Sequence, residues 1–266
     1  MRIALGLEYD GSAFHGWQSQ EGVRTLQDCV ESALGKVADH RVAVVTAGRT
    51  DAGVHASGQV VHFDSDARRP LRAWLRGGNS HLPAEIRIQW AAHVAAGFHA
   101  RFSARSRHYR YLILNRPVPP AVGRAYLTWE YRPLDERGMA AAAKYLVGEH
   151  DFSSYRAVAC QAKSPVRNLF RLDVCRRGAQ VIIDAVANAF LHHMVRNIAG
   201  VLMAIGAGER EPYWAYEVLE RRDRALGGVT APPEGLHLIA VEYPERFALP
   251  ITAPGDPRAP EMPSTC

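Results

Sequence analysis

The chain has 266 residues, of which 47% are hydrophobic and 22% charged, and its formal net charge is +5. This composition is typical of a globular protein with enough apolar material for one large domain or two small ones. No apolar run approaches the roughly 20 residues of a membrane-spanning helix, and the first residues already alternate like a strand. We therefore expect neither a membrane anchor nor a signal peptide, and a cytoplasmic location.

The cysteines and the basic residues add weaker constraints. The four cysteines form no CxxC pair, which argues against structural zinc and thioredoxin chemistry and fits reduced thiols in the cytosol. Nearly all basic residues are arginine, whose planar fork grips phosphate and stacks on bases. A basic chain suits a polyanionic partner, although a preference for GC-rich codons explains the arginine content equally well.

Hydrophobic spacing predicts strands and helices in an irregular order. In the first half we expect strands over 2–9, 42–46, 59–63, 86–92 and 109–114, a helix opening at Thr25 with Asp28 as its capping partner, a short helix over 71–75 and a loop over 78–83. In the second half we expect helices over 135–146, 190–205 and 212–222, a hairpin of 169–176 with 180–186, and a strand over 236–243. No regular βαβ rhythm appears, which favours an α+β fold with a mostly antiparallel sheet.

The same pattern indicates how the chain is divided. It suits one subdomain over residues 1–104 and a second over 105–247. The remaining residues, 248–266, are rich in proline and are expected to be disordered.

One loop carries more chemical information than any other segment. Between two expected strands stands the sequence AGRTDAGVHA, from Ala47 to Ala56, whose glycines allow a tight turn. The turn carries Arg49 and Asp51, one residue apart. A carboxylate beside a guanidinium could be an always-ionised nucleophile or an ion-pair anchor, and residue chemistry alone leaves open a plain surface loop.

This loop resembles the catalytic loop of the tRNA pseudouridine synthase A family. Further segments extend the resemblance from about residue 3 to residue 247: YDG with GWQ near residues 9–18, FHARFSA at 98–104, RHYRY at 107–111, NAFLHHMVRN at 188–197 and APPEGL at 231–236. No position that the family uses for chemistry departs from its pattern.

The resemblance implies a fold, an activity and partners. It implies two α/β subdomains with mostly antiparallel sheets joined across a central catalytic cleft. It implies isomerisation of uridine to pseudouridine at positions 38, 39 and 40 in the anticodon stem-loop of tRNA. The target base would be flipped out of its stem at a cost of about a few kcal/mol. No cofactor, metal or nucleotide is implied, because the reaction is redox-neutral, and family members are homodimers.

Three residues match the family's catalytic positions. Asp51 is implied to be the nucleophile that attacks the uridine, and Arg196 to be the cation that pairs with it. Without the resemblance, Arg196 would be an ordinary solvated helix arginine. Tyr109 is implied to stack on the target uridine or to deprotonate it, the alternative being a core tyrosine of a strand.

Several arginines are candidate substrate-binding residues. Arg49 could support the flipped nucleotide or a phosphate, or could simply stabilise its loop. Arg101, Arg107 and Arg110 cluster before and within one expected strand and could line a phosphate-binding groove, although a solvated basic face fits almost as well.

Other chemistries find little support in the sequence. His192 and His193 are expected on a helix, where adjacent side chains point about 100° apart, so we do not expect them to bind one metal ion. The chain lacks the GxxxxGK[ST], GxGxxG and GxSxG motifs. Two alternatives remain: a non-catalytic RNA-binding protein on the same scaffold, and an unrelated hydrolase with an aspartate nucleophile.

Overall fold

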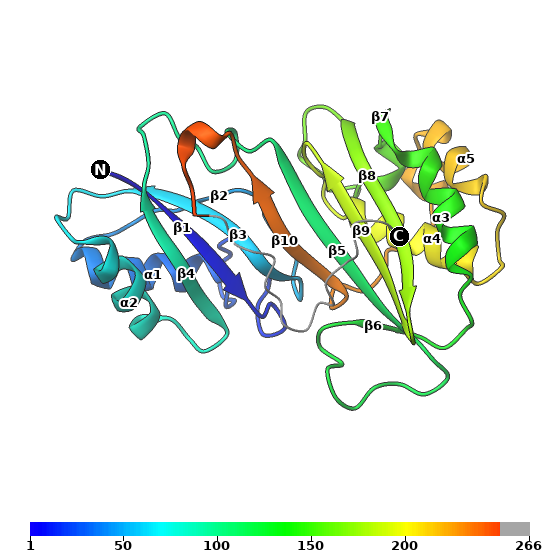
Figure 1. Cartoon of the computed structure of the whole chain (residues 1–266), viewed down its shortest axis with the longest axis horizontal. Coiled ribbons are helices and arrows are strands. Elements are labelled where there is room, and N and C mark those ends of the chain that lie inside the picture. The colour runs from blue at the N-terminus through cyan, green and yellow to red at the C-terminus, as the bar shows by residue number, and fades with distance from the viewer. Residues whose placement is uncertain (251–266) are drawn as a thin grey trace. The chain divides into compact units, whose positions relative to one another are not determined.

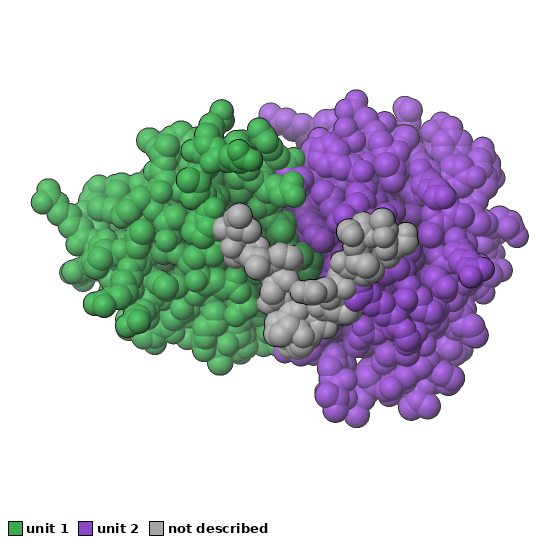
Figure 2. All heavy atoms as spheres, viewed as in Figure 1, with its two compact units in different colours: residues 1–105, 238–260 green, residues 106–237, 261–266 purple. Residues whose placement is uncertain are grey.

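The computed structural model describes residues 1–250, which divide into two compact units (Figures 1 and 2). Of the described residues, unit 1 comprises Met1–Arg105 together with 238–250, and unit 2 comprises Ser106–His237. In this division most of the last strand lies with unit 1, whereas we predicted it in the second subdomain, 105–247. Strands and helices mix in both units, so the expected α+β class is confirmed.

Unit 1 is built on a sheet whose strands come from both ends of its sequence. The strand order is β4 (Ile86–His93), β1 (Arg2–Tyr9), β3 (His55–Asp64) and β10 (Leu236–Glu242), with the short β2 (Val45–Thr46) on β3. β1 runs antiparallel to β3 and β4, and β2 antiparallel to β3. Alternate residues Ile3, Leu5 and Leu7 of β1 are fully buried, as the alternation predicts.

The helices of unit 1 are α1 (Leu26–Ala38) and α2 (Leu71–His81). Thr25 caps α1 as expected: its hydroxyl accepts from the Asp28 backbone N–H at 3.3 Å and donates to the Asp28 carboxylate at 2.5 Å. α2 is twice as long as predicted and includes most of the expected loop. Gly78 explains the extension. A Cβ there would lie 2.4 Å from Ile88 Cδ1 of β4, so the missing side chain lets the helix continue past this position while it packs closely on the strand.

The sheet strands of unit 2 are mostly antiparallel (Figure 1). The strand order is β5 (Ser106–Asn115), β9 (Gln180–Ala187), β8 (Val166–Arg177) and β7 (Gly148–Asp151), and β6 (Thr128–Glu130) runs parallel to β5. The predicted hairpin is β8 with β9. Three helices accompany these strands: α3 (Glu136–Ala143), α4 (Met194–Gly206) and α5 (Trp214–Arg221). α3 is capped by the Asp135 carboxylate.

Helix α4 begins four residues later than the sequence predicted. His193 has a left-handed backbone with φ of 63°, which ends the preceding segment and starts the helix at Met194. His192 and His193 therefore precede the helix, and their rings lie 4.1 Å apart. The expectation that a helix turns these two side chains away from each other is wrong.

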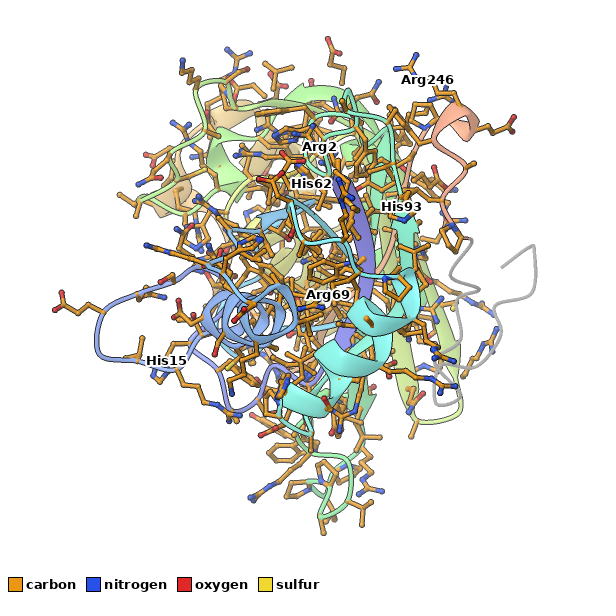
Figure 3. All side chains as sticks on the ribbon, turned by 90° about the vertical axis from the view of Figure 1, so that its left-hand side faces the viewer. Arg2, His15, His62, Arg69, His93 and Arg246 are labelled. Atoms are coloured by element: carbon orange, nitrogen blue, oxygen red, sulfur yellow. The ribbon has the colours of Figure 1, made fainter. Side chains whose placement is uncertain are left out.

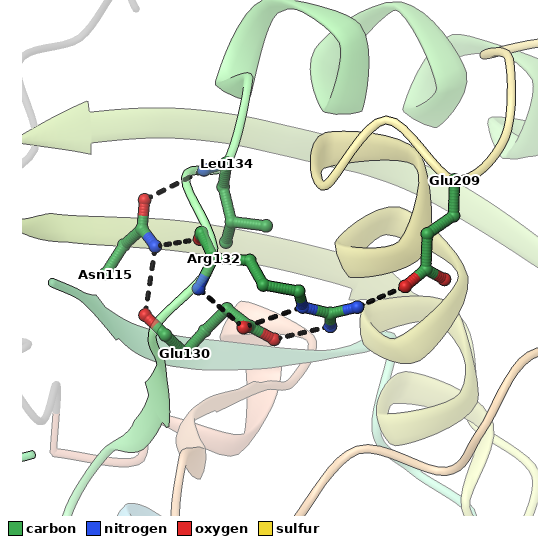
Figure 4. A network of polar contacts seen from close by, with 5 residues as sticks. All are labelled: Asn115, Glu130, Arg132, Leu134 and Glu209. Atoms are coloured by element: carbon green, nitrogen blue, oxygen red, sulfur yellow. Dashed lines mark hydrogen bonds and ion pairs between the residues drawn. The ribbon is translucent and has the colours of Figure 1, made fainter. Parts of the chain in front are cut away.

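A polar network fixes the connection from β5 to α3 in unit 2 (Figure 4). The Asn115 amide donates to the carbonyls of Glu130 and Arg132 at 3.0 and 2.6 Å and accepts from Leu134 N–H at 3.0 Å. Arg132 forms a bidentate pair with Glu130 and a further ion pair with Glu209. The hydrogen bond from Arg132 lowers the pKa of Glu130 and outweighs burial, which alone would raise that pKa.

The expected C-terminal tail, 248–266, lies mostly outside the described residues. Of the part that is described, Leu249 packs with Phe247 against the small core around Phe98 in unit 1. Within residues 1–250, no helix has the length and hydropathy that crossing a bilayer demands.

His62 on β3 should make the stability of unit 1 depend on pH (Figure 3). Burial, together with the positive charge of nearby Arg2, lowers the pKa of His62 to about 4, and its Nδ1 accepts from Ala100 N–H at 3.1 Å. As the pH falls, His62 of the unfolded chain takes up a proton near pH 6.5, whereas His62 of the folded chain does so only near pH 4. The free energy of unfolding should therefore fall by about 2 to 3 kcal/mol between pH 6.5 and pH 4.

The matched variant is His62→Asn, whose amide oxygen can accept the Ala100 hydrogen bond without titrating. Denaturant unfolding across this pH range should give a flatter stability curve for the variant than for the native chain. Parallel curves would show that His62 does not carry the effect.

Candidate active site

The predicted catalytic loop joins β2 to β3 in unit 1. Asp51 is half-buried and Arg49 is exposed, on the same turn. Gly53 adopts φ of 78°, which favours glycine, and the Val54 N–H donates to the Asp51 carbonyl at 3.2 Å. The chain thus reverses tightly just after Asp51 and enters β3 at His55.

The segment after β1 holds this turn from one side. The Trp17 N–H donates to the Thr50 carbonyl at 2.9 Å, and a Cβ on Gly16 would lie 2.8 Å from that oxygen. A Cβ on Gly11 would lie 2.0 Å from the carbonyl oxygen of Val54, which no side chain allows. The glycines of the YDG and GWQ segments are therefore explained by their close approach to the catalytic loop.

A buried hydrogen-bond network holds the turn from the other side. The Gln59 amide nitrogen donates to the Gly48 carbonyl at 2.7 Å and to the Tyr9 hydroxyl at 3.2 Å. The Tyr9 hydroxyl also lies 2.8 Å from Thr50 Oγ1, a hydrogen bond in which either hydroxyl can be the donor. Burial raises the pKa of Tyr9 to about 12, so this hydroxyl keeps its proton at neutral pH.

We expect Tyr9→Phe to lower kcat about tenfold with little change in KM, because the variant loosens the residue next to Asp51 without touching the RNA. Loss of the buried hydrogen bond should also lower the free energy of unfolding by about 1 to 2 kcal/mol. Steady-state kinetics and denaturant unfolding measure the two effects.

Tyr155→Phe is the matched control for this loss of stability. The Tyr155 hydroxyl is also buried and donates to the Ala215 carbonyl at 2.9 Å, in the helical part of unit 2. Its loss should lower stability similarly and leave kcat unchanged. Equal losses of kcat in both variants would mean that Tyr9 acts only through global stability.

The remaining catalytic candidates belong to unit 2. Tyr109 lies on β5 opposite Ala185 of β9, is 7% exposed, and its ring meets Phe190 edge-on at 5.1 Å. Phe190, which we predicted at the start of the helix, instead precedes it and supports this ring. The sequence contains both aromatics, but their contact depends on the strand register and could not be predicted.

Arg196 stands in the first turn of α4 and is half-buried. Its Nε donates to the Ala231 carbonyl at 2.8 Å, while the Ala231 N–H donates back to the Arg196 carbonyl at 3.1 Å. Arg196 is therefore braced by the APPEGL segment rather than extended into solvent. This role of Ala231 could not be predicted from sequence, because a backbone carbonyl leaves no signature in residue type.

The three arginines of the expected phosphate groove lie in different environments. Arg101 is exposed in unit 1. Arg107 is buried and donates to the Asn188 carbonyl at 2.8 Å. Arg110 is buried in a bidentate pair with Asp184, at 3.0 and 3.1 Å, and His108 also contacts that carboxylate at 2.6 Å. Arg107 and Arg110 project from opposite faces of β5, so they do not line one groove.

Asp184 explains why Arg110 is buried. Burial alone would raise the pKa of this carboxyl, but hydrogen bonds from His108 and Arg110 outweigh it and lower the pKa. A buried ionised pair of this kind favours a structural role for Arg110 over contact with RNA. Arg49 and Arg101 are the exposed members of the predicted binding set.

The loop thus carries Asp51 on a hydrogen-bonded turn of unit 1, and unit 2 carries Tyr109 and Arg196. A family model described as tRNA pseudouridine synthase matches residues 7–103 and 142–244. The chain therefore belongs to the tRNA pseudouridine synthase family, and it is an isomerase of that family.

Close relatives cover nearly the whole chain. The protein named tRNA pseudouridine synthase A from Alcanivorax borkumensis is 61% identical over 94% of this chain and 94% of its own length. Proteins of the same name from Nitrosococcus oceani and Pseudomonas aeruginosa are 62% and 59% identical, each over 94% of this chain and over 96% and 88% of their own lengths. The predicted family and activity are confirmed, and the alternative of a non-catalytic RNA-binding protein has no support.

Proposed function

We propose that this tRNA pseudouridine synthase isomerises uridine at positions 38, 39 and 40 of the anticodon stem-loop, with Asp51 as its nucleophile. The observation that carries the proposal is the ordered turn at Asp51. Tyr9, at the end of β1, and Trp17, in the segment after it, form hydrogen bonds to Thr50, and Gln59 of β3 forms one to Gly48. A nucleophile must be held in a reactive geometry before its substrate arrives, and such a turn does this.

The chemistry needs only groups of the chain and the RNA. The bond between uracil N1 and the ribose C1′ breaks, the base turns, and a bond from uracil C5 to C1′ replaces it; the C5 proton leaves and N1 takes up a proton, so that the product is an isomer of the substrate. Asp51 attacks the uridine to start this exchange, Arg196 pairs with its carboxylate to keep it ionised, and Tyr109 stacks on the base or accepts the C5 proton. Arg49, Arg101 and Arg107 are the proposed contacts to RNA, whereas the buried pair with Asp184 favours a structural role for Arg110.

Tritium release tests the target positions. Transcripts labelled at uracil C5 lose tritium to water when C5 becomes bonded to the sugar. We expect release from a tRNA with uridine at position 38, 39 or 40, and none when all three are cytidine. Undiminished release from the triple-cytidine transcript would place the target elsewhere.

The proposal includes assembly and location. We propose a homodimer that acts on tRNA in the cytoplasm, as the resemblance to the family implies. Light scattering should then give about twice the chain mass of 29.4 kDa. A clean monomer at working concentration would contradict the dimer without affecting the assignment of the reaction.

A further inference from the structure

A short turn in unit 1 holds a phenylalanine ring out of the protein surface. Phe102 is 76% exposed, and its ring lies 4.3 Å from the His99 ring with only 30° between the two planes. Leaving a phenylalanine side chain in water forgoes about 1.5 to 3 kcal/mol of burial. An exposed ring that already stacks on a second ring on one side offers its other side to a further planar group.

Hydrogen bonds fix this turn. The Nδ1 atom of His99 accepts from the backbone N–H groups of Arg101 and Phe102, both at 3.2 Å. Ser103 closes the turn, because its N–H donates to the His99 carbonyl at 2.8 Å and its Oγ accepts from the His99 N–H at 3.0 Å. Burial and the nearby Arg2 lower the pKa of His99, which keeps the ring neutral and Nδ1 an acceptor. Phe102 is therefore pre-ordered.

The surroundings of the ring are positively charged. The Arg101 guanidinium lies 5.6 Å from the Phe102 ring centroid, and both Arg101 and Arg105 are exposed. An aromatic ring beside arginine is the combination by which proteins bind single-stranded nucleic acid: the ring stacks on a base and the cation meets the backbone phosphate.

We propose that Phe102, supported by His99 and flanked by Arg101, is a stacking site for an unpaired nucleobase of the tRNA substrate. The inference rests on the action of the chain on tRNA, and it adds a binding residue that the sequence analysis did not single out. The loops of tRNA supply unpaired bases whose faces are open to an aromatic side chain.

The small size of the apolar surface favours a base over a second protein chain. Among residues 94–105, Phe102 is the one large hydrophobic side chain that is exposed. A stable protein–protein contact buries about 800 Å² on each partner, which one ring cannot supply. A single planar base needs only one ring face.

Binding of unmodified tRNA tests the site. We expect Phe102→Ala to raise the Kd about 5- to 100-fold, the range measured when base–aromatic stacking is lost. Phe102→Tyr should restore binding, because it keeps a ring of the same size, whereas Phe102→Leu should stay weak although it is apolar. Phe170→Ala is the matched control: Phe170 on β8 is 50% exposed and should bind as the native chain does.

Salt dependence separates stacking from charge. The slope of log Kd against log salt concentration should be unchanged in Phe102→Ala, because no phosphate contact is lost, and should fall by about one in Arg101→Gln. Native affinity in Phe102→Ala, or full affinity in Phe102→Leu, would overturn the proposal. So would a change in oligomeric mass of Phe102→Ala in light scattering, since it would make the ring a protein contact.

The outcome can be read separately from that of the proposed reaction. Tritium release by the native chain reports the isomerisation, and the Kd series reports the stacking site. If the Phe102 variants change the Kd as expected but the native chain releases no tritium, the stacking site stands and the proposed reaction is wrong. If the native chain releases tritium but the Phe102 variants all bind with native Kd, the reaction stands and the stacking site is wrong.

Discussion

Replacing Asp51 by Asn should abolish tritium release from C5-labelled tRNA, lowering kcat by at least about a thousandfold. The amide has the size of the carboxylate but is not a nucleophile, and loss of a covalent nucleophile removes the central step rather than a fraction of its rate. tRNA binding should be almost unchanged, because the substitution keeps the size of the side chain, and the backbone hydrogen bonds of Thr50 and Val54 that hold the turn do not depend on its charge. Release and Kd are measured on the same transcript.

Asp66→Asn is the matched control. Asp66 is an exposed aspartate that follows β3 in the same unit, and its conversion removes the same charge. It should release tritium at the native rate. If Asp51→Asn released tritium as well, the nucleophile would have to be another residue, and the assignment of this turn would be wrong.

Local elements were predictable where one signal dominates. The alternation in β1 and the threonine cap of α1 each depend on neighbours within a few residues, and both predictions are confirmed. α2 was predicted too short because its extension depends on Gly78 meeting Ile88, a contact between segments that local spacing does not contain. The start of α4 was wrong because nothing in the residue type of His193 announces a left-handed backbone.

In the candidate site, too, contacts between segments distant in sequence could not be predicted. Asp51, Arg196 and Tyr109 were found through resemblance, since residue chemistry alone left each with a plain structural alternative. The groups that hold them were not found. Tyr9 bonds to Thr50, 41 residues away, Gln59 bonds to Tyr9, 50 residues away, as well as to Gly48, and Ala231 acts through its backbone. Burial of Arg110 could not be foreseen either, because its partner Asp184 lies on another strand.

Gly200→Ala should cause the largest loss of stability among simple substitutions near the candidate site. In the interior of a helix this change normally gains about 1 kcal/mol, since alanine is the better helix former. Here the new Cβ would lie 1.8 Å from the Val229 carbonyl oxygen, a backbone atom that cannot rotate away. We expect the free energy of unfolding to fall by about 3 kcal/mol or more, at the upper end of overpacking.

The same substitution should lower activity beyond its effect on folding. To admit the Cβ, residues 229–231 must move away from α4, and Ala231 would then lose both of its hydrogen bonds to Arg196. Folded Gly200→Ala, assayed well below its melting temperature, should therefore have a reduced kcat. Gly97→Ala, whose Cβ would meet no atom within 4 Å, should change neither quantity. A variant with low stability and native kcat would show that Arg196 keeps its position without the Ala231 brace, and that α4 alone is enough to hold it.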